Sequence, residues 1–475
     1  MDKATQAKYN YWQWRTLIAL IVGYTFYYFL RKNFSAAIPA MNETLGITKT
    51  QLGLFLSLNG IVYGLSRFIN GILADRYNKR LMMTMGLVLS AIINFAICFS
   101  PKMNGFINVL DTEGKATMTL VYIIGSLWVL NGYVHGMGYP PCASLMAHWF
   151  RPSELATKQS IWNASHSIGA GLVVALCGWM LSKWGYSAWQ LCFAVPAVLS
   201  LMGAIYLYMS LRDTPSSVGL PEIEELERME GNKKENEKED VELSGSEFKK
   251  FVNQMVFRNK HVWIVSLADF CVYVIRFTIL EWGTMFLTQY KGLPIALAAS
   301  IVAASELIGG VFGTVVAGWV TDRFFKSRTI RTCVFCMLGA TASFFVFWLL
   351  PKDAPWIFTA FFIVLSAFFV YGPQALLGVS ASQYATKKAS ASSNGFVGIW
   401  CYAASLIAGV GFGALAESEA YGWNAVFIVT FLFGLLGAGI LALMWNAPAD
   451  DYVRAEKVLA KIAEEREMNN ESLDD

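Results

Sequence analysis

Long apolar segments alternate with short polar ones along most of the 475 residues of this chain. About 20 mostly apolar residues are needed for one helix to cross the hydrocarbon core of a bilayer. Runs of that length recur, and we expect twelve spans, near residues 14–38, 51–74, 81–100, 118–139, 157–182, 187–210, 261–288, 294–320, 332–350, 356–380, 391–416 and 423–446. The pattern predicts an all-α membrane protein with twelve transmembrane helices.

One long polar segment, 212–260, divides the twelve spans into six and six. Its dense alternation of Glu and Lys is typical of a solvated, partly helical segment. A second polar stretch with some helical period follows the last span. We therefore predict an N-terminal six-helix half at 1–211, a cytoplasmic linker at 212–260, a C-terminal six-helix half at 261–447 and a cytoplasmic tail at 448–475.

The short loops between the spans differ in their arginine content. Loops on one side hold six arginines and those on the other side hold none; the six are Arg76, Arg80, Arg151, Arg323, Arg328 and Arg331. Positive charge in short loops favours the cytoplasmic side. We therefore expect a multi-pass protein of the inner (plasma) membrane, with the linker and both termini in the cytoplasm.

Composition narrows the class further. Charged residues make up 15% of the chain, against about 25% in soluble domains, and a net charge of +3 is too small to indicate nucleic acid. The eight cysteines lie in or beside apolar runs, and we interpret Cys333 and Cys336 as apolar residues one helical turn apart. With no nucleotide-binding loop, nucleophile–base pair or metal cluster in the sequence, we expect neither an enzyme nor a cofactor.

A short motif occurs once in each half. Gly71 precedes Asp75-Arg76 after the second span, and Gly318 precedes Asp322-Arg323 after the eighth. Glycine permits close helix contact, and an Asp-Arg pair can hold the cytoplasmic ends of neighbouring helices together through charge-assisted hydrogen bonds. This G-x-x-x-D-R signature resembles that of the major facilitator superfamily, which implies two pseudo-symmetric six-helix halves and a gating role for Asp75, Arg76, Asp322 and Arg323.

Arg31 and Arg276 stand inside apolar spans, where charge is costly and usually functional. Arg31 shares a helix face with Tyr24 and Tyr28, and Arg276 shares one with Tyr273. The two arginines lie at equivalent points of the first helix of each half. Two guanidinium groups facing one cavity would bind a phosphate or a carboxylate through paired hydrogen bonds.

Two points stay open at this stage. A nearby carboxylate could neutralise each arginine for purely structural reasons, and Asp269 and Glu281 lie close to Arg276 in the sequence. His166 stands in the middle of the fifth span, where it is either a hydrogen-bonded core residue or a site residue. An imidazole titrates near neutral pH and could follow the protonation state of a phosphate.

Six segments resemble the organophosphate:phosphate antiporter family, which includes glycerol-3-phosphate and hexose-6-phosphate carriers and a sugar-phosphate sensor. They are Tyr27-Tyr28-Phe-Leu-Arg31-Lys32-Asn33-Phe34, Gly136-Met-Gly-Tyr-Pro-Pro-Cys142, Trp162-Asn163-Ala-Ser-His166, Arg212-Asp-Thr-Pro-Ser-Ser-Val-Gly219, Tyr273-Val-Ile-Arg276 and Tyr371-Gly-Pro-Gln374. The resemblance implies that Arg31 and Arg276 bind phosphate and that His166 is central. It also implies a lining of Tyr24, Tyr28, Asn163, Tyr273, Tyr371 and Tyr402, with Lys32, Arg67, Glu281 and Glu306 as charged positions near the path.

The resemblance further implies a monomeric secondary transporter that exchanges an organic phosphate ester, glycerol 3-phosphate or a hexose 6-phosphate, for inorganic phosphate by alternating access. Departures at Ala143 and Ser144 and around Glu306 leave the organic part of the substrate open. One alternative is a membrane sugar-phosphate sensor of the same fold that signals to a kinase partner. Another is a proton-coupled sugar or drug carrier of the same superfamily.

Overall fold

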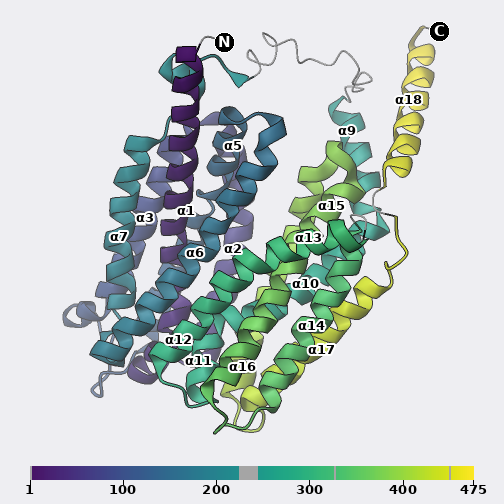
Figure 1. Ribbon diagram of the computed structural model, residues 1–475. Coiled ribbons are helices and arrows are strands. Elements are labelled where there is room, and N and C mark those ends of the chain that lie inside the picture. Colours follow the sequence, from purple (N-terminus) through teal and green to yellow (C-terminus); the bar gives the residue numbers. More distant parts are fainter. Residues whose placement is uncertain (1–2, 224–243, 326–327, 449–450, 475) are drawn as a thin grey trace.

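The computed structural model describes residues 3–223, 244–325, 328–448 and 451–474. The regular elements in these ranges are helices, arranged as two bundles whose termini lie at the same end of the molecule (Figure 1). Residues 224–243, which make up the most charged part of the expected linker, lie outside the described residues.

The first bundle is built from seven helices: α1 (Lys3–Leu45), α2 (Lys49–Arg76), α3 (Lys79–Phe99), α4 (Met118–His135), α5 (Tyr139–Trp149), α6 (Pro152–Trp184) and α7 (Leu191–Ser210). Short 3₁₀ turns come after α3, α6 and α7; they are η1 (Ser100–Gly105), η2 (Tyr186–Ala188) and η3 (Pro215–Val218). Thr48 and Gln51 form a capping box that starts α2. The span expected at 118–139 ends early, because the chain turns at Gly136–Gly138 before α5 begins.

The second bundle begins with α9 (Gly245–Val252), the π-helical turn η4 (Asn253–Phe257), α10 (Lys260–Glu281) and α11 (Gly283–Gln289). It continues through α12 (Ile295–Ala304), η5 (Ser305–Gly313), α13 (Thr314–Phe325), α14 (Thr329–Leu349), α15 (Trp356–Leu406), η6 (Ile407–Gly411), α16 (Phe412–Glu417), α17 (Gly422–Ala442) and α18 (Tyr452–Asp474). Helix α15 covers two expected spans, and Thr386, with φ 60° and ψ 173°, marks the break between them.

Ten helical stretches in the described ranges are long and apolar enough to cross a membrane. The two remaining expected spans are the helices α1 and α2, whose apolar runs are interrupted by Arg31 and Lys32 in one case and Arg67 in the other. Together they give the twelve-helix architecture that the sequence predicts. The chain is therefore a multi-pass membrane protein.

The two bundles touch at the end opposite the termini and diverge toward the termini (Figure 1). Glycine makes the contact close: a Cβ added at Gly53 on α2 would lie 2.3 Å from the carbonyl oxygen of Gly409 on η6. Beside it, the amide of Thr50 donates to Glu417 at 3.1 Å, and Lys49 Nζ donates to the carbonyl oxygen of Ala416 at 2.9 Å. In the described ranges, the halves are thus closed against each other at the end opposite the termini.

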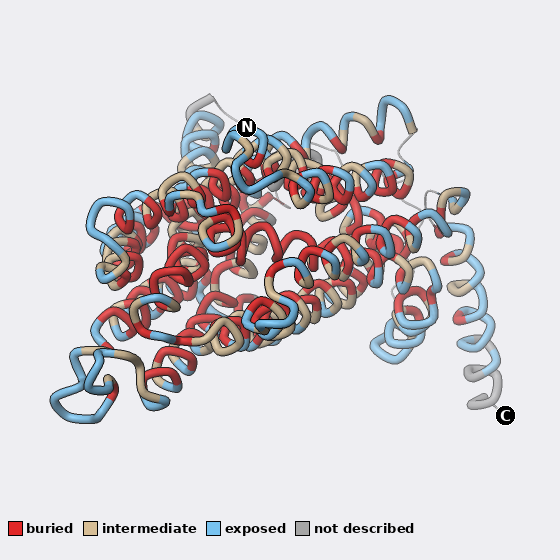
Figure 2. The backbone as a smooth tube through the Cα atoms, turned by 90° about the horizontal axis from the view of Figure 1, so that it is seen from below, coloured by how far each residue is buried: buried red, intermediate tan, exposed pale blue. Residues whose placement is uncertain are grey.

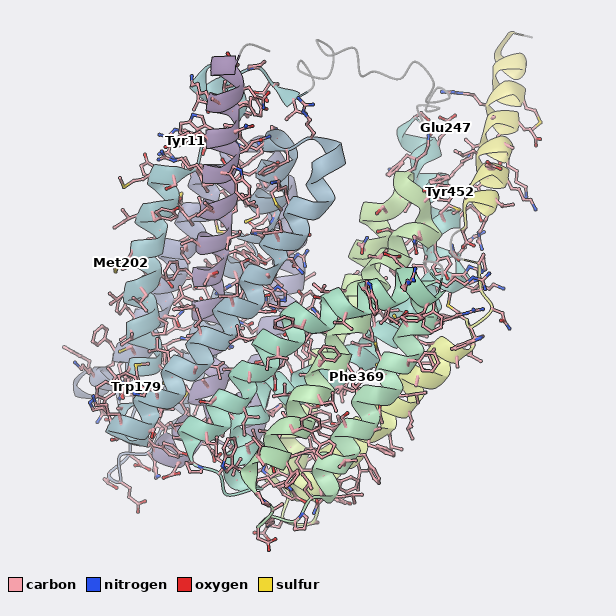
Figure 3. All side chains as sticks on the ribbon, viewed as in Figure 1. Tyr11, Trp179, Met202, Glu247, Phe369 and Tyr452 are labelled. Carbon is pink, nitrogen blue, oxygen red and sulfur yellow. The ribbon has the colours of Figure 1, made fainter. Side chains whose placement is uncertain are left out.

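The surface of the bundles fits a lipid environment. Buried segments gather in the interior of the molecule (Figure 2). Apolar side chains such as Trp179 and Met202 project from the outer flank of the first bundle (Figure 3), where they are 52% and 62% exposed. Large exposed apolar side chains on a helix flank are what acyl chains cover.

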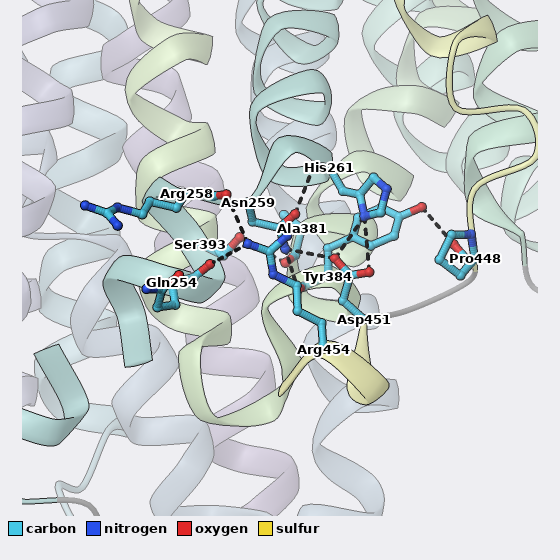
Figure 4. Close-up of polar contacts among 10 residues, drawn as sticks. All are labelled: Gln254, Arg258, Asn259, His261, Ala381, Tyr384, Ser393, Pro448, Asp451 and Arg454. Carbon is cyan, nitrogen blue, oxygen red and sulfur yellow. Dashed lines mark hydrogen bonds and ion pairs between the residues drawn. The ribbon is translucent and has the colours of Figure 1, made fainter. Parts of the chain in front are cut away.

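The C-terminal helix α18 is fastened to the second bundle at its start (Figure 4). Asp451 lies 2.9 Å from His261 Nδ1 and accepts a hydrogen bond from Asn259 Nδ2 at 2.8 Å. Arg454 donates to the carbonyl oxygens of Gln254 and Arg258, both at 3.0 Å. The expected solvated tail is helical, and its first turn is anchored rather than free.

Candidate functional site

The position of Arg31 is fixed by polar contacts within the first bundle. Asn131 Nδ2 on α4 donates to the carbonyl oxygen of Leu30 at 2.9 Å, and Asn33 Nδ2 donates to Asn94 on α3 at 2.8 Å. The Cζ atom of Arg31 lies 3.9 Å from the ring centroid of Tyr63 on α2 and 5.6 Å from that of Tyr28. Its guanidinium group therefore lies against aromatic faces, which attract cations.

Arg276 holds the equivalent place in the second bundle. It is 7% exposed, and its Cζ lies 5.5 Å from the ring centroid of Tyr273 and 5.4 Å from that of Tyr371 on α15. Its Nε has no hydrogen-bond partner among the described residues. Among the described residues, no carboxylate oxygen lies within 4.0 Å of a guanidinium nitrogen of Arg31 or Arg276.

The carboxylates that the sequence offered to Arg276 contact other groups. Glu281 lies 2.5 Å from Lys32 Nζ and also accepts a hydrogen bond from Ser35. Asp269 accepts a hydrogen bond from the thiol of Cys401. Neither carboxylate of α10 therefore forms an ion pair with Arg276, and the contacts do not support the alternative in which one of them neutralises it.

Lys32 on α1 joins the two halves by contacting two carboxylates of the second bundle. Besides Glu281 on α10, its Nζ lies 3.7 Å from Glu306 on η5, and Lys32 itself is 3% exposed. Tyr371 donates a hydrogen bond to the other oxygen of Glu306. Lys32, which follows Arg31 directly in the chain, is thus neutralised, while Arg31 is not.

His166 on α6 lies between the halves. Its ring centroid is 5.5 Å from that of Tyr28 on α1 and 6.5 Å from that of Tyr371 on α15. Nδ1 contacts the carbonyl oxygen of Asn163, and Nε2 is 3.3 Å from Ser167 Oγ. His166 is 7% exposed, whereas Asn163 is exposed.

The other tyrosines predicted to line the cavity form two groups. Tyr24 packs on Tyr28 with ring centroids 5.5 Å apart, and Tyr402 packs on Tyr273 at 6.3 Å and on Tyr63 at 5.2 Å. The second group crosses the interface, because Tyr63 belongs to the first bundle and Tyr402 to the second. A cavity of ≈ 40 Å³ beside Arg31 and Tyr402 also has lining from both halves, enough for water but smaller than a phosphate ester.

A family model described as Major Facilitator Superfamily matches residues 20–409. The chain belongs to this superfamily. A glycerol-3-phosphate transporter of Bacillus subtilis (strain 168) is 34% identical over 94% of this chain and 95% of that protein. A probable hexose phosphate transport protein of Chlamydia pneumoniae is 31% identical over 94% of each. Within the superfamily, the chain therefore belongs to the organophosphate:phosphate antiporter family, a family of transporters.

Two further comparisons bear on fold and on role. The membrane sensor protein UhpC of Escherichia coli (strain K12) is 30% identical over 92% of each chain. The solved structure of a D-xylose-proton symporter aligns with a TM-score of 0.67 and 15% identity, covering 90% of this chain and 96% of that one. At such low identity the structural likeness shows the superfamily fold alone.

The four gating residues expected in this superfamily member lie at helix ends on the side of the termini. Asp75 and Arg76 end α2, but their side chains lie outside the described residues. Asp322 and Arg323 lie in the last turn of α13, and both are exposed. No group of three or more His, Cys, Asp or Glu side chains in the described residues could hold a metal ion.

Sequence reasoning missed two residues of this central region. Tyr63 makes the closest aromatic contact of Arg31, and Ser35 donates to Glu281. Tyr63 precedes Arg67 by one helical turn, and Arg67 stacks on Tyr139 with Cζ 3.9 Å from the ring centroid. That helical spacing beside a charged residue was the available signal for Tyr63.

Proposed function

We propose that this protein is a secondary transporter that exchanges an organic phosphate ester, glycerol 3-phosphate or a hexose 6-phosphate, for inorganic phosphate by alternating access. The observation that carries the proposal is the pair of arginines inside the helical bundles, one from each half, that face aromatic rings and lie apart from carboxylates of the described residues. The relatives named as glycerol-3-phosphate and hexose phosphate transporters support it.

In this proposal Arg31 and Arg276 bind the phosphoryl group from opposite sides. A guanidinium group is always charged and forms paired hydrogen bonds with phosphate oxygens. His166 adds a ring nitrogen between the halves. Tyr24, Tyr28, Asn163, Tyr273, Tyr371 and Tyr402 shape the remaining surface, and Lys32 becomes available to the anion when it leaves Glu281.

The charge distribution gives a reason for exchange. Without an anion, closure of the halves would bring two unneutralised guanidinium groups together in a medium of low dielectric constant, which is costly. A phosphate dianion cancels that charge, so the loaded transporter changes state readily and the empty one slowly. We assign the closing of the terminal side, which we place in the cytoplasm, to Asp75-Arg76 and Asp322-Arg323.

A sensor is the second candidate, because UhpC, a relative at 30% identity, is named as a membrane sensor. Both roles need a phosphate-ester site, so binding alone does not distinguish them. Uptake of labelled glycerol 3-phosphate or glucose 6-phosphate into proteoliposomes does. A transporter accumulates label, whereas a sensor binds the ester with no uptake above that of empty vesicles.

Thermal stabilisation tests whether the site recognises the phosphate group of its ligand. Purified protein would be titrated with inorganic phosphate, glycerol 3-phosphate, glucose 6-phosphate and unphosphorylated glucose, with thermal stabilisation as the readout. We expect the phosphate-bearing ligands to raise the unfolding midpoint and glucose to leave it unchanged. Stabilisation by glucose equal to that by its phosphate ester would contradict the proposal.

A further inference from the structure

One buried carboxylate lies outside the charge network of the proposed site. Asp269 on α10 is 3% exposed, its Oδ2 accepts a hydrogen bond from Cys401 Sγ at 2.9 Å, and its Oδ1 has no partner among the described residues. In the same ranges no Lys, Arg or His nitrogen lies within 4.0 Å of it. By contrast, Glu281 and Glu306 both lie within that distance of Lys32.

This environment favours the neutral acid when Asp269 is considered alone. A thiol is a weak hydrogen-bond donor, and an ionised carboxylate that is buried with only such a partner is far more costly than a protonated one. Carboxylates inside membrane spans are rare and usually functional for this reason.

Arg276 has the opposite effect on Asp269, because its positive charge favours the ionised carboxylate. Asp269, Tyr273 and Arg276 follow one another at i, i+4 and i+7, so they share one face of α10. The titratable or charged groups within electrostatic reach of Asp269 are Arg276, Tyr273 and Cys271 on α10, Cys401 on α15 and Cys333 on α14. Within this set the charged group is Arg276, and its positive charge favours the ionised carboxylate.

Binding of an anion at Arg276 would change this balance. A phosphate dianion cancels the charge of Arg276, so the burial of Asp269 is no longer opposed and the carboxylate gains affinity for a proton. We infer that Asp269 is a proton-binding site, which takes up a proton as phosphate binds and carries it across with the anion.

This inference rests on the proposed function, because it requires phosphate at Arg276. The proton comes from water on the side where phosphate enters, bonds to a carboxylate oxygen of Asp269, and returns to water when phosphate leaves. No bond of the substrate is broken. The loaded transporter would then move one negative charge fewer per dianion than its substrate alone carries.

Proton uptake can be counted by titration calorimetry. The full-length protein and Asp269→Asn would be titrated with inorganic phosphate in two buffers of different ionisation enthalpy, at several pH values. We expect wild type to take up about one proton more per bound phosphate than Asp269→Asn at the pH of greatest linkage. The comparison cancels protons exchanged by phosphate itself and by His166.

Asp451→Asn is the matched control, because Asp451 is also buried but lies outside the spans, beside His261. It should give the wild-type proton count. Equal counts in wild type and Asp269→Asn would overturn the inference while leaving phosphate binding intact. If wild type gave no binding heat at any pH, the proposed function itself would fail.

Affinity gives a second readout of the same titrations. Asparagine resembles the neutral acid, so Asp269→Asn should bind phosphate at least about fivefold more tightly than wild type at high pH, where empty wild type is ionised. The two should converge at low pH. Weaker binding by the variant at every pH would contradict the role of Asp269.

Cys401→Ser covers the case in which Asp269→Asn fails to fold. It keeps the carboxyl group and replaces the thiol with a stronger donor, which stabilises the ionised form. Proton uptake should therefore move to lower pH by a measurable shift. An unshifted profile in a folded Cys401→Ser protein would overturn the inference.

Discussion

At the scale of single residues, Arg31 and its neighbour Lys32 differ in the groups that they contact. Lys32 contacts two carboxylates, whereas Arg31 lies against aromatic rings and has no carboxylate of the described residues within 4.0 Å, so its positive charge can attract an anion. Arg31→Lys and Arg276→Lys should each lower phosphate exchange more than about tenfold, nearly as much as alanine does, because lysine lacks the paired donors. Exchange rates in proteoliposomes measure this loss.

Arg15→Lys is the matched control for that comparison. Arg15 lies on the same helix, α1, but donates to the carbonyl oxygens of Ser210 and Met209 within the first bundle. Its replacement should leave exchange within about twofold of wild type, as expected of a surface substitution. Near-normal exchange by folded Arg31→Lys would show that paired hydrogen bonding is not required.

The sequence could predict residues whose chemistry conflicts with their surroundings. Arg31, Arg276 and His166 stand out in the sequence as candidate site residues because charged or titratable groups interrupt apolar runs there. The partner of Glu281 was not, because Lys32 is 249 residues away in the chain and meets it only when the halves pack. Proximity in sequence suggested Arg276 as the partner, and the packing of α1 against α10 decided otherwise.

At the scale of helices, Lys32 links α1 to the second bundle. Removing one partner of a buried ion pair leaves an uncompensated charge and costs about 3–5 kcal/mol. Lys32→Met should therefore lower the free energy of unfolding by that order, and Glu281→Gln in the same chain should recover part of it. Denaturation in detergent measures both effects.

The exposed pair Lys250–Glu465 provides the control, with side chains 58% and 51% exposed. Lys250→Met should change stability by less than about 1 kcal/mol, since exposed ion pairs contribute little. If Lys32→Met were as mild as Lys250→Met, Lys32 would not hold the halves together.

The anchor of α18 depends on pH through Asp451 (Figure 4). Burial would raise the pKa of Asp451, but hydrogen bonds from His261 and Asn259 outweigh it and hold that pKa below its ordinary value. Because an unfolded Asp titrates near about 3.9, the stabilisation is complete above about pH 4 and is lost as pH falls through the folded pKa.

Asp451→Asn should therefore loosen α18 at neutral pH. Loss of these charge-assisted hydrogen bonds should lower the local opening free energy by about 1–2 kcal/mol. Hydrogen exchange in the first turns of α18 should rise, whereas Glu465→Gln should leave those turns at wild-type protection. Unchanged protection in Asp451→Asn would mean that apolar contacts alone hold the helix.

The sequence predicted which segments are helices more accurately than it predicted where those helices end. Apolar length identified the spans, but the turn at Gly136–Gly138 and the break at Thr386 depend on local backbone geometry within continuous apolar runs. The anchoring of α18 was not predictable either, because its polar pattern also fits a solvated helix and its contacts come from distant residues such as Asn259.

At the scale of the whole molecule, the close approach of the halves at one end depends on glycine. A side chain at Gly53 would collide with backbone atoms of Gly409, which cannot move away as a flexible side chain would. Gly53→Ala should therefore disfavour this state and increase the population closed on the terminal side. Spin labels at Tyr77→Cys and Phe324→Cys, both exposed positions, should report shorter distances.

Gly398→Ala is the control, because a Cβ there meets nothing within 4 Å. It should leave the distance distribution of the labels unchanged. The same unchanged distribution in Gly53→Ala would show that this contact does not bias the two states.

Labelled-phosphate counterflow tests the central claim, exchange at a site shared by both halves, most directly. Separate batches of proteoliposomes would be loaded with unlabelled phosphate, glycerol 3-phosphate, glucose 6-phosphate or glucose, and each batch would be diluted into a trace of labelled phosphate. The account predicts transient accumulation of label above its equilibrium level with internal phosphate and with at least one of the two esters, glycerol 3-phosphate and glucose 6-phosphate, none with internal glucose, and none with Arg31→Ala. Equal entry of label into loaded and empty vesicles would contradict it.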